Sequence, residues 1–170
     1  MIDNKTIFKN IKKINHRKKI ETQGALMKNN TYTFYFAYGS NMNQEQMEYR
    51  CLNSRPLGKV SLLGYRFIIN SRGVATIIPH NYSTVNGVLW LINLKHELTL
   101  DYFEGVKKKI YFKKYCYITY LNQRVLSLVY IAFNKVIGNP RKGYLEKVID
   151  GAKSFNAKKK WINELKNWQK

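Results

Sequence analysis

The run YFAYGSNM, residues 35–42, constrains the fold of this chain more than any other segment. Its apolar half predicts a buried strand over residues 33–38, and a helical pattern follows over residues 43–51. The Gly39-Ser40-Asn41 turn between them leaves backbone N–H groups free where a helix start adds partial positive charge. Such a turn suits a small anion, a carboxylate or a phosphate. An ordinary strand-to-helix turn, with Asn41 or Asn43 as the N-cap, fits the same residues.

The remaining strand signals, with the helices between them, predict an α+β fold. Strand material lies at residues 60–63, 65–69, 73–78 and 85–92, and we expect Pro79 and the pair Asn86-Gly87 to interrupt it. Residues 111–120 and 125–133 alternate around residues 121–124. This pattern predicts a hairpin, although its connection is not one of the preferred two-residue turns.

Four helices are expected. Asn43, with Gln46 three residues later, predicts a capping box at the start of the first. The second helix is expected at residues 95–103 and ends before Gly105. Its apolar face consists of Leu94, Leu98 and Tyr102. Pro140 opens the third, with a core face of Tyr144, Leu145, Val148 and Ala152. Residues 157–168 continue or repeat it and bury Trp161, Leu165 and Trp168.

The charge of the chain is strongly positive. Its 170 residues include 30 Lys and Arg against 10 Asp and Glu, a formal net charge of +20. Residues 1–31 are basic and, apart from Phe8 and several isoleucines, short of large apolar residues. Ile7, Ile11 and Ile14 are spaced like one face of a short amphipathic helix, but we prefer a disordered extension before one domain at residues 32–170. Met27, close to that boundary, is a candidate start of translation.

Such a charge attracts polyanions and acidic small molecules. A solvated, lysine-rich surface accounts for the same residues, and no recognised nucleic-acid-binding motif stands in the sequence. We therefore do not expect a nucleic-acid partner, and the oligomeric state stays open.

The cysteines, histidines and apolar runs indicate no cofactor and no membrane span. Cys51 and Cys116 belong to no CxxC pair, so we expect reduced, core-filling side chains. His16, His80 and His96 form no spaced ligand cluster, which argues against a metal site. No apolar run approaches about 18 residues and no signal-peptide pattern opens the chain, so we expect a cytoplasmic protein.

Three motifs, in this order and spacing, resemble the gamma-glutamylcyclotransferase (AIG2-like) family. YFAYGSNM is followed by GVLW at residues 87–90 and by LDYFEGV at residues 100–106, and Tyr111 stands seven residues after Glu104. The runs RCLNSRPLGKVSLLGYRF and YLEKVIDGAKSF are similar to that family too, so the resemblance spans about residues 32–168. It implies a small, partly closed mixed β-barrel flanked by helices.

The resemblance also implies a reaction, an intramolecular aminolysis. The α-amino group of a γ-glutamyl amino acid or γ-glutamyl amine attacks its own γ-carbonyl, which forms 5-oxoproline and releases the amino acid or amine. Neither a metal nor a cofactor is needed, because the substrate carries its own nucleophile. Residues 141–143 and 155–161 depart from the family pattern where the leaving group is expected to be selected, so its identity stays open.

Glu104 is the catalytic residue that the resemblance implies, as a general acid and base. A Glu at the end of a helix faces the negative end of the dipole, so it is not placed there for helix stability. Apolar surroundings would raise its pKa and the lysines at residues 107–109 would lower it, and the sequence leaves both open. A surface Glu paired with a lysine is the alternative.

The resemblance implies a γ-glutamyl-binding role for six further residues: Tyr38, Gly39, Ser40, Asn41, Tyr111 and Tyr144. Tyr38 fits equally well as a core aromatic that ends the first strand. Asp101 is expected to support structure by bonding to backbone or to a lysine. Arg50 and Arg72 are candidate carboxylate clamps, for which surface solvation is the preferred interpretation.

Two functions are therefore open from the sequence. The first is a gamma-glutamylcyclotransferase-like enzyme that acts on a small γ-glutamyl molecule. The second is a non-catalytic domain that binds a small acidic ligand or a polyanion through the same pocket or through the basic surface.

Overall fold

The computed structural model describes residues 32–168, so the expected extension at residues 1–31 lies outside it. Five strands form one mixed sheet in the order β2-β3-β1-β5-β4: β1 (Tyr32–Ala37), β2 (Arg55–Ile69), β3 (Ala75–Asn93), β4 (Tyr111–Tyr120) and β5 (Gln123–Ala132). β1 lies in the middle and pairs in parallel with β5. Its last four residues are buried, as expected for a central strand covered on both faces.

The long strands β2 and β3 correct the expectation of four shorter ones. They pair antiparallel, and Pro79 stands inside β3 opposite Tyr65. Between that pair and the pair Leu63 and Thr84 the register shifts, so residues 80–83 leave the ladder as a bulge. Gly87 also stays in the strand, opposite Val60. A bulge absorbs the proline, and the ladder continues on both sides of it.

The hairpin of β4 and β5 is confirmed, but its turn is a two-residue one. Tyr120 pairs with Gln123, which leaves Leu121 and Asn122 as the turn. Both have positive φ, 48° and 59°. A left-handed pair of this kind matches the twist of the flanking strands, and leucine is not a residue from which it would be predicted.

Contacts between the outer strands of the sheet, β2 and β4, close the barrel in part. The Tyr120 hydroxyl donates to the Leu57 carbonyl at 3.4 Å, and the Lys114 ammonium lies 5.4 Å from the centre of the Tyr65 ring. No backbone ladder joins the two strands in the sheet order of the described residues. The expected α+β fold with a partly closed mixed barrel is therefore confirmed.

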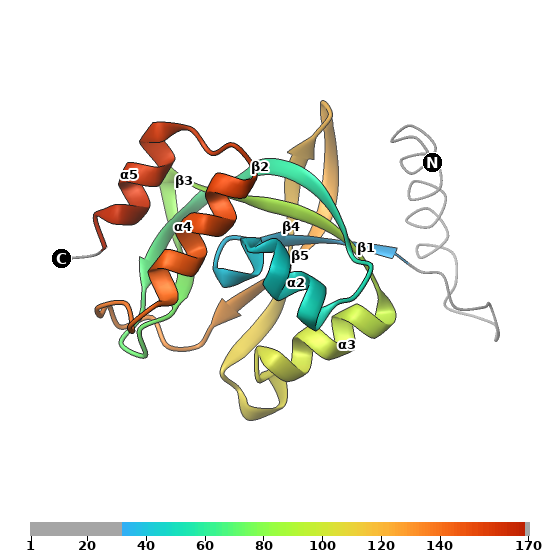
Figure 1. The fold of residues 1–170 in the computed structure, drawn as a ribbon, viewed down its shortest axis with the longest axis horizontal. Coiled ribbons are helices and arrows are strands. Elements are labelled where there is room, and N and C mark those ends of the chain that lie inside the picture. Colours follow the sequence, from blue (N-terminus) through green and yellow to red (C-terminus); the bar gives the residue numbers. More distant parts are fainter. Residues whose placement is uncertain (1–31, 169–170) are drawn as a thin grey trace. The chain divides into compact units, whose positions relative to one another are not determined.

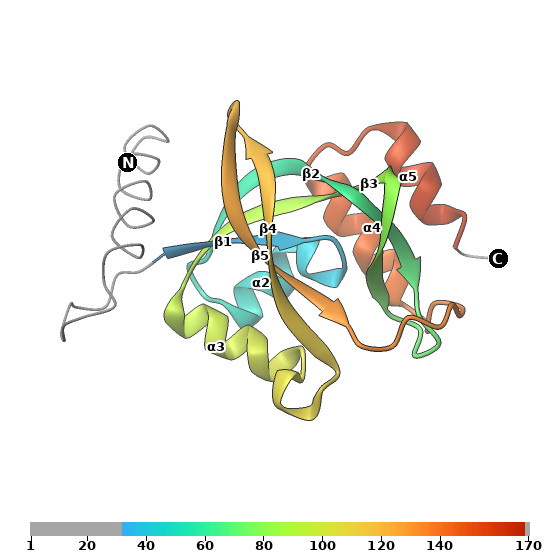
Figure 2. The same ribbon diagram turned by 180° about the vertical axis from the view of Figure 1, so that it is seen from behind.

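Four helices of the described residues flank the sheet: α2 (Gln44–Arg50), α3 (Leu94–Phe103), α4 (Tyr144–Ser154) and α5 (Lys159–Lys166). Figure 1 shows α4 and α5 together at one end of the sheet, with α2 and α3 toward the other. Figure 2 shows the opposite side, where the β4–β5 hairpin crosses in front of β1.

The first helix pair corrects two details of the sequence analysis. Asn43 caps α2 by accepting from the Gln46 backbone, but the Gln46 side chain bonds to Ser40 and Asn41, so the box is not closed. In α3 the expected apolar side, with Leu94, Leu98 and Tyr102, is exposed, and Leu100 is buried instead. An apolar helix face without a neighbour stays in solvent whatever its periodicity.

The C-terminal helices agree with the expected core faces. Tyr144, Leu145, Val148 and Ala152 of α4 are buried, although the helix begins four residues after Pro140. Trp161 and Leu165 of α5 are buried as expected, and Trp168 is half-buried. Cys51 and Cys116 are both free and buried, which confirms core-filling thiols. Within residues 32–168 no helix is long and apolar enough to span a bilayer.

Gly151 allows α4 to pack directly on the backbone that leaves the Gly-Ser-Asn turn. A Cβ at this position would stand 2.5 Å from the Asn43 amide nitrogen and 2.7 Å from the Met42 carbonyl carbon. Backbone atoms at that distance cannot move aside without displacing the turn. We expect Gly151→Ala to lower the free energy of unfolding by about 2 kcal/mol, as overpacking does, when measured by urea denaturation.

A matched control for this substitution is Lys147→Ala, on the exposed side of the same helix. It should change the free energy of unfolding by less than about 0.5 kcal/mol. Equal stability of the two variants would contradict the close packing of α4 on the turn.

Candidate active site

The seven residues to which the sequence analysis gave a role in catalysis or γ-glutamyl binding lie around one small pocket. Its lining comes from β1, the turn after β1, the end of α3, the starts of β3, β4 and α4, and β5. The lining includes Tyr38, Gly39, Ser40, Asn41, Glu104, Tyr111 and Tyr144, and also Tyr35, Ala75 and Tyr130. The cavity measures about 30 Å³, room for about two water molecules.

The turn after β1 takes the form of one 3₁₀ turn, Ser40–Met42, capped by Gly39. Gly39 has φ −109°, so the position does not require a left-handed backbone. It is close approach that favours glycine: a Cβ would stand 2.9 Å from the Tyr144 hydroxyl. The Ser40 hydroxyl accepts from the Gln46 side chain at 2.8 Å, which ties the turn to α2.

Glu104 is the C-cap of α3, and the next residue, Gly105, ends the helix in the left-handed region with φ 66°. Its Oε1 accepts from Asn41 Nδ2 at 3.0 Å and from Arg50 Nη1 at 3.2 Å. The side chain is only 15% exposed. The carboxylate is therefore held inside the pocket, and the surface alternative, a Glu paired with a lysine, does not describe it.

The pKa of Glu104 is raised above its ordinary value of 4.5. Burial is the largest cause and favours the neutral acid. The nearby Arg50 charge and the hydrogen bonds from Asn41 and Arg50 act in the opposite direction without cancelling it. From the sequence, burial could raise the pKa of Glu104 or the lysines at residues 107–109 could lower it. In the fold, burial has the larger effect on this pKa, and the cation that opposes it is Arg50.

Arg50 is a site residue for which the sequence analysis preferred solvation, and that preference was wrong. Its Nη1 donates to Asn41 Oδ1 at 2.9 Å as well as to Glu104. Its guanidinium lies 4.5 Å from the centre of the Phe103 ring, which adds a cation–π contact. The position of Arg50 in the last turn of α2 was the available signal, because Asn43 starts that helix beside the turn.

Asn41 is the centre of this polar network. Its Nδ2 donates to the Tyr35 hydroxyl at 2.8 Å and to Glu104, while its Oδ1 accepts from Gln46 and Arg50. The residue is buried, with 4% exposure. Every polar atom of the side chain is thus used, so it orients the Glu104 carboxylate firmly.

Three tyrosine hydroxyls reach the backbone around the pocket. Tyr111 donates to the Ala75 carbonyl at 2.8 Å, and Tyr144 accepts from the Ala75 amide at 3.1 Å. Tyr38 donates to the Tyr130 carbonyl. Burial raises the pKa of all three phenols, so they are neutral hydrogen-bonding groups. Tyr144 accepts from the amide and so keeps its own proton for a further partner.

Asp101 and Arg72 lie outside the pocket. Asp101 Oδ2 pairs with Lys113 at 2.8 Å and its Oδ1 accepts from the Tyr130 hydroxyl at 2.7 Å, which confirms the expected structural role. Arg72 is exposed in the connection between β2 and β3, as expected for a solvated side chain. The described residues contain no group of three His, Cys, Asp or Glu suited to hold a metal ion.

Two tyrosines of the pocket, Tyr35 and Tyr130, were not predicted from the sequence. Tyr35 belongs to the same run as Tyr38, and its hydroxyl meets Asn41. Tyr130 stands on β5, and its ring packs edge-on against Tyr35 at 5.7 Å. A chain with 13 tyrosines offers no way to choose these two before β1 and β5 are known to be neighbours.

The fold and part of the sequence are similar to those of known proteins. The AIG2-like family matches at residues 84–165. A solved structure of a gamma-glutamyl cyclotransferase aligns with a TM-score of 0.74 and 24% identity over 80% of this chain and 87% of that one. An uncharacterised human protein aligns with a TM-score of 0.74 and 25% identity over 81% and 88%.

The chain is more distantly similar to the solved structure of a yeast gamma-glutamyl cyclotransferase specific to glutathione. The TM-score is 0.51 and the identity 15%, over 82% of this chain and 92% of that one. No curated protein matches the sequence. The fold is that of the gamma-glutamyl cyclotransferases, and residues 84–165 are similar to the AIG2-like family.

Proposed function

We propose that this protein converts a γ-glutamyl amino acid or γ-glutamyl amine into 5-oxoproline and the free amino acid or amine. The observation that carries the proposal is the buried carboxyl of Glu104, held by Asn41 and Arg50 in a pocket lined by tyrosines. Its pKa is raised, as a group that must take and return a proton near neutral pH requires.

Glu104 handles the proton in both halves of the reaction. It accepts a proton from the α-ammonium group, and the freed amine attacks the γ-carbonyl carbon to form the C–N bond of the lactam. The bond to the leaving nitrogen then breaks as Glu104 returns the proton to that nitrogen, and the attacking nitrogen passes its second proton to the released amine, which leaves as the ammonium form. No covalent bond to the protein forms, so the main demand is to fold the substrate chain into the reactive shape.

The remaining pocket residues bind and orient the γ-glutamyl group. Backbone N–H groups of Gly39, Ser40 and Asn41 are proposed to meet its α-carboxylate or the oxyanion on the γ-carbonyl. Tyr111 and Tyr144 offer phenols, and Tyr38 packs beneath the ligand. A γ-glutamyl group is larger than the cavity of about 30 Å³, so we expect the rim to widen on binding.

The direct test is mass-spectrometric detection of 5-oxoproline. Purified protein is incubated with a panel of γ-glutamyl dipeptides, glutathione and γ-glutamyl amines. Product from any member supports the proposal and begins to define the leaving group. A folded protein that releases no 5-oxoproline from any member contradicts it and leaves the pocket as a binding site.

The raised pKa of Glu104 makes a prediction about pH. The general base is the ionised form, whose population grows as the pH rises through the raised pKa. We expect kcat/KM for 5-oxoproline release to fall on the acid side with an apparent pKa above 4.5. A pH profile measures this, and an acid limb at or below 4.5 would show that the titrating group is not a buried Glu104.

A further inference from the structure

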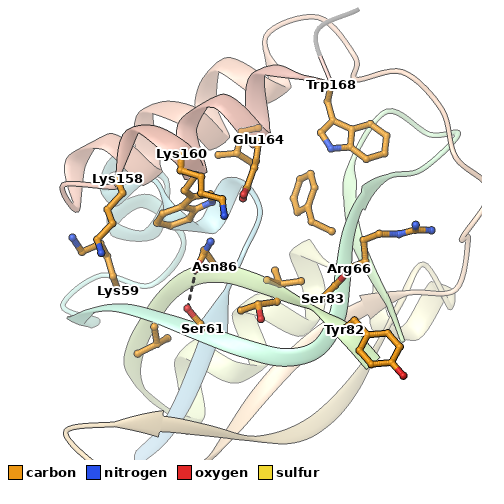
Figure 3. A pocket seen from close by; sticks show the side chains of 16 residues that line it. Lys59, Ser61, Arg66, Tyr82, Ser83, Asn86, Lys158, Lys160, Glu164 and Trp168 are labelled. Atoms are coloured by element: carbon orange, nitrogen blue, oxygen red, sulfur yellow. Dashed lines mark hydrogen bonds between the residues drawn. The ribbon is translucent and has the colours of Figure 1, made fainter. Parts of the chain in front are cut away.

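A second, larger hollow lies apart from the candidate active site. It is a groove of about 770 Å³ between α5 and the outer parts of β2 and β3 (Figure 3). Trp161 and Leu165 of α5 form its buried wall. A hydrogen bond of 2.8 Å from Ser61 to Asn86 lies on its β-strand side. None of its lining residues borders the Glu104 pocket.

The groove is positively charged along its length. Four cations and one carboxylate line it: Lys59, Arg66, Lys158, Lys160 and Glu164. Figure 3 shows Lys59 and Lys158 at one end, Lys160 between, and Arg66 at the other end. Within residues 32–168 none of the four cations forms a salt bridge, and Lys59 Nζ donates to the Asn156 carbonyl at 2.7 Å. Positive charges at both ends of a groove and between them suit a ligand that carries several negative groups along an extended chain.

Aromatic rings accompany these cations. Tyr82 lies in the bulge of β3, is 97% exposed, and stands near Arg66 at one end of the groove. Trp168 lies above the same end and packs edge-on against Phe67, with 6.2 Å between the ring centres. An exposed ring beside a cation is an arrangement on which a nucleobase can stack while the cation meets a phosphate.

We propose that this groove binds single-stranded nucleic acid. The cations would contact successive phosphates, and Tyr82 and Trp168 would stack on bases. A mononucleotide would use one end only, and a second copy of this chain, with its formal charge of +20, does not complement a basic groove. The sequence analysis expected no such partner, because no recognised nucleic-acid-binding motif stands in the chain. The groove is assembled from β2, β3 and α5, which no single motif brings together. The proposal does not depend on the proposed cyclotransferase activity.

The test uses the full chain and a fluorescein-labelled short oligouridylate, followed by fluorescence anisotropy over a range of salt concentrations. The groove variant Lys158→Gln with Lys160→Gln is compared with the control Lys107→Gln with Lys108→Gln. All four lysines are exposed, and each variant removes two charges. The first variant removes them from the groove, and the control removes them from the turn after α3. If the groove is the site, the groove variant weakens binding by about tenfold at 0.1 M salt and lowers the salt slope by about 1.4. The control should leave both nearly unchanged.

The aromatic contribution has its own pair of variants. Tyr82→Ala should weaken binding by about fivefold or more, as loss of a stacking ring does. Tyr102→Ala is the control, a tyrosine 82% exposed outside the groove. Equal weakening by the two lysine variants would overturn the proposal in favour of diffuse charge. The proposal would also be overturned if a polyglutamate probe bound as tightly as oligouridylate and Tyr82→Ala left that binding unchanged. Absence of oligouridylate binding would overturn it too.

Discussion

Replacing Glu104 by glutamine is expected to reduce 5-oxoproline release by about 10²- to 10⁴-fold, the usual contribution of general acid–base catalysis. The amide has nearly the shape of the carboxyl, and its Oε1 can still accept from Asn41 and Arg50, which now bond to Glu104 at 3.0 and 3.2 Å. What it lacks is the ability to take and return a proton. Mass spectrometry of single γ-glutamyl substrates measures the change.

The matched control is Glu97→Gln, on the same helix but outside the pocket, where Glu97 pairs with Lys113 at 3.1 Å. It should retain nearly all of the activity. Full activity of Glu104→Gln would show that another group moves the proton. Loss in both variants would point to a damaged α3 instead.

The pH dependence of stability tests whether Glu104 is the titrating group independently of any activity. Because the pKa of Glu104 is raised in the folded state, its contribution to stability is fully present below pH 4.5 and is lost as the pH rises through the raised pKa. Glutamine does not titrate, so that part of the pH dependence should disappear in the variant. Urea denaturation at several pH values measures this, and an unchanged dependence would place the titrating group elsewhere.

Replacing Arg50 by methionine is expected to raise the pKa of Glu104 further. The guanidinium now opposes the effect of burial through its charge and through a hydrogen bond. Without it, the ionised carboxylate keeps only the bond from Asn41. Each unit by which the pKa exceeds the working pH lowers the population of the base about tenfold. The acid limb of the rate profile should therefore move to higher pH.

This prediction can be checked without activity. NMR titration of the side-chain carboxyl of Glu104 reports its pKa directly, in the wild type and in Arg50→Met. Arg72→Met is the control, since Arg72 is exposed and outside the pocket. We also expect Arg50→Met to lower the free energy of unfolding by about 1–3 kcal/mol, because a buried acceptor loses a charged donor. An unchanged titration of Glu104 would show that Arg50 does not act on it.

The candidate pocket could be predicted in outline because its central residues stand in short motifs. All seven residues expected to act in catalysis or γ-glutamyl binding line it, and those roles are still predictions. The partners of Glu104 were harder to predict. Asn41 lies 63 positions away and Arg50 lies 54 positions away, and no local pattern indicates which of the 30 basic residues meets this carboxylate.

Local conformational preferences by themselves determined the strand that enters the Gly-Ser-Asn turn, the cap at Asn43, the stop of α3 at Gly105 and the core face of α4. These depend on neighbours within a few residues, so they can be read from the chain. Only the tertiary structure decided that β3 continues through Pro79, that Leu98 faces solvent, that burial governs the pKa of Glu104 and that a basic groove forms beside α5. Each of these depends on which distant segment covers a given surface, and burial and charge pairing are properties of that contact.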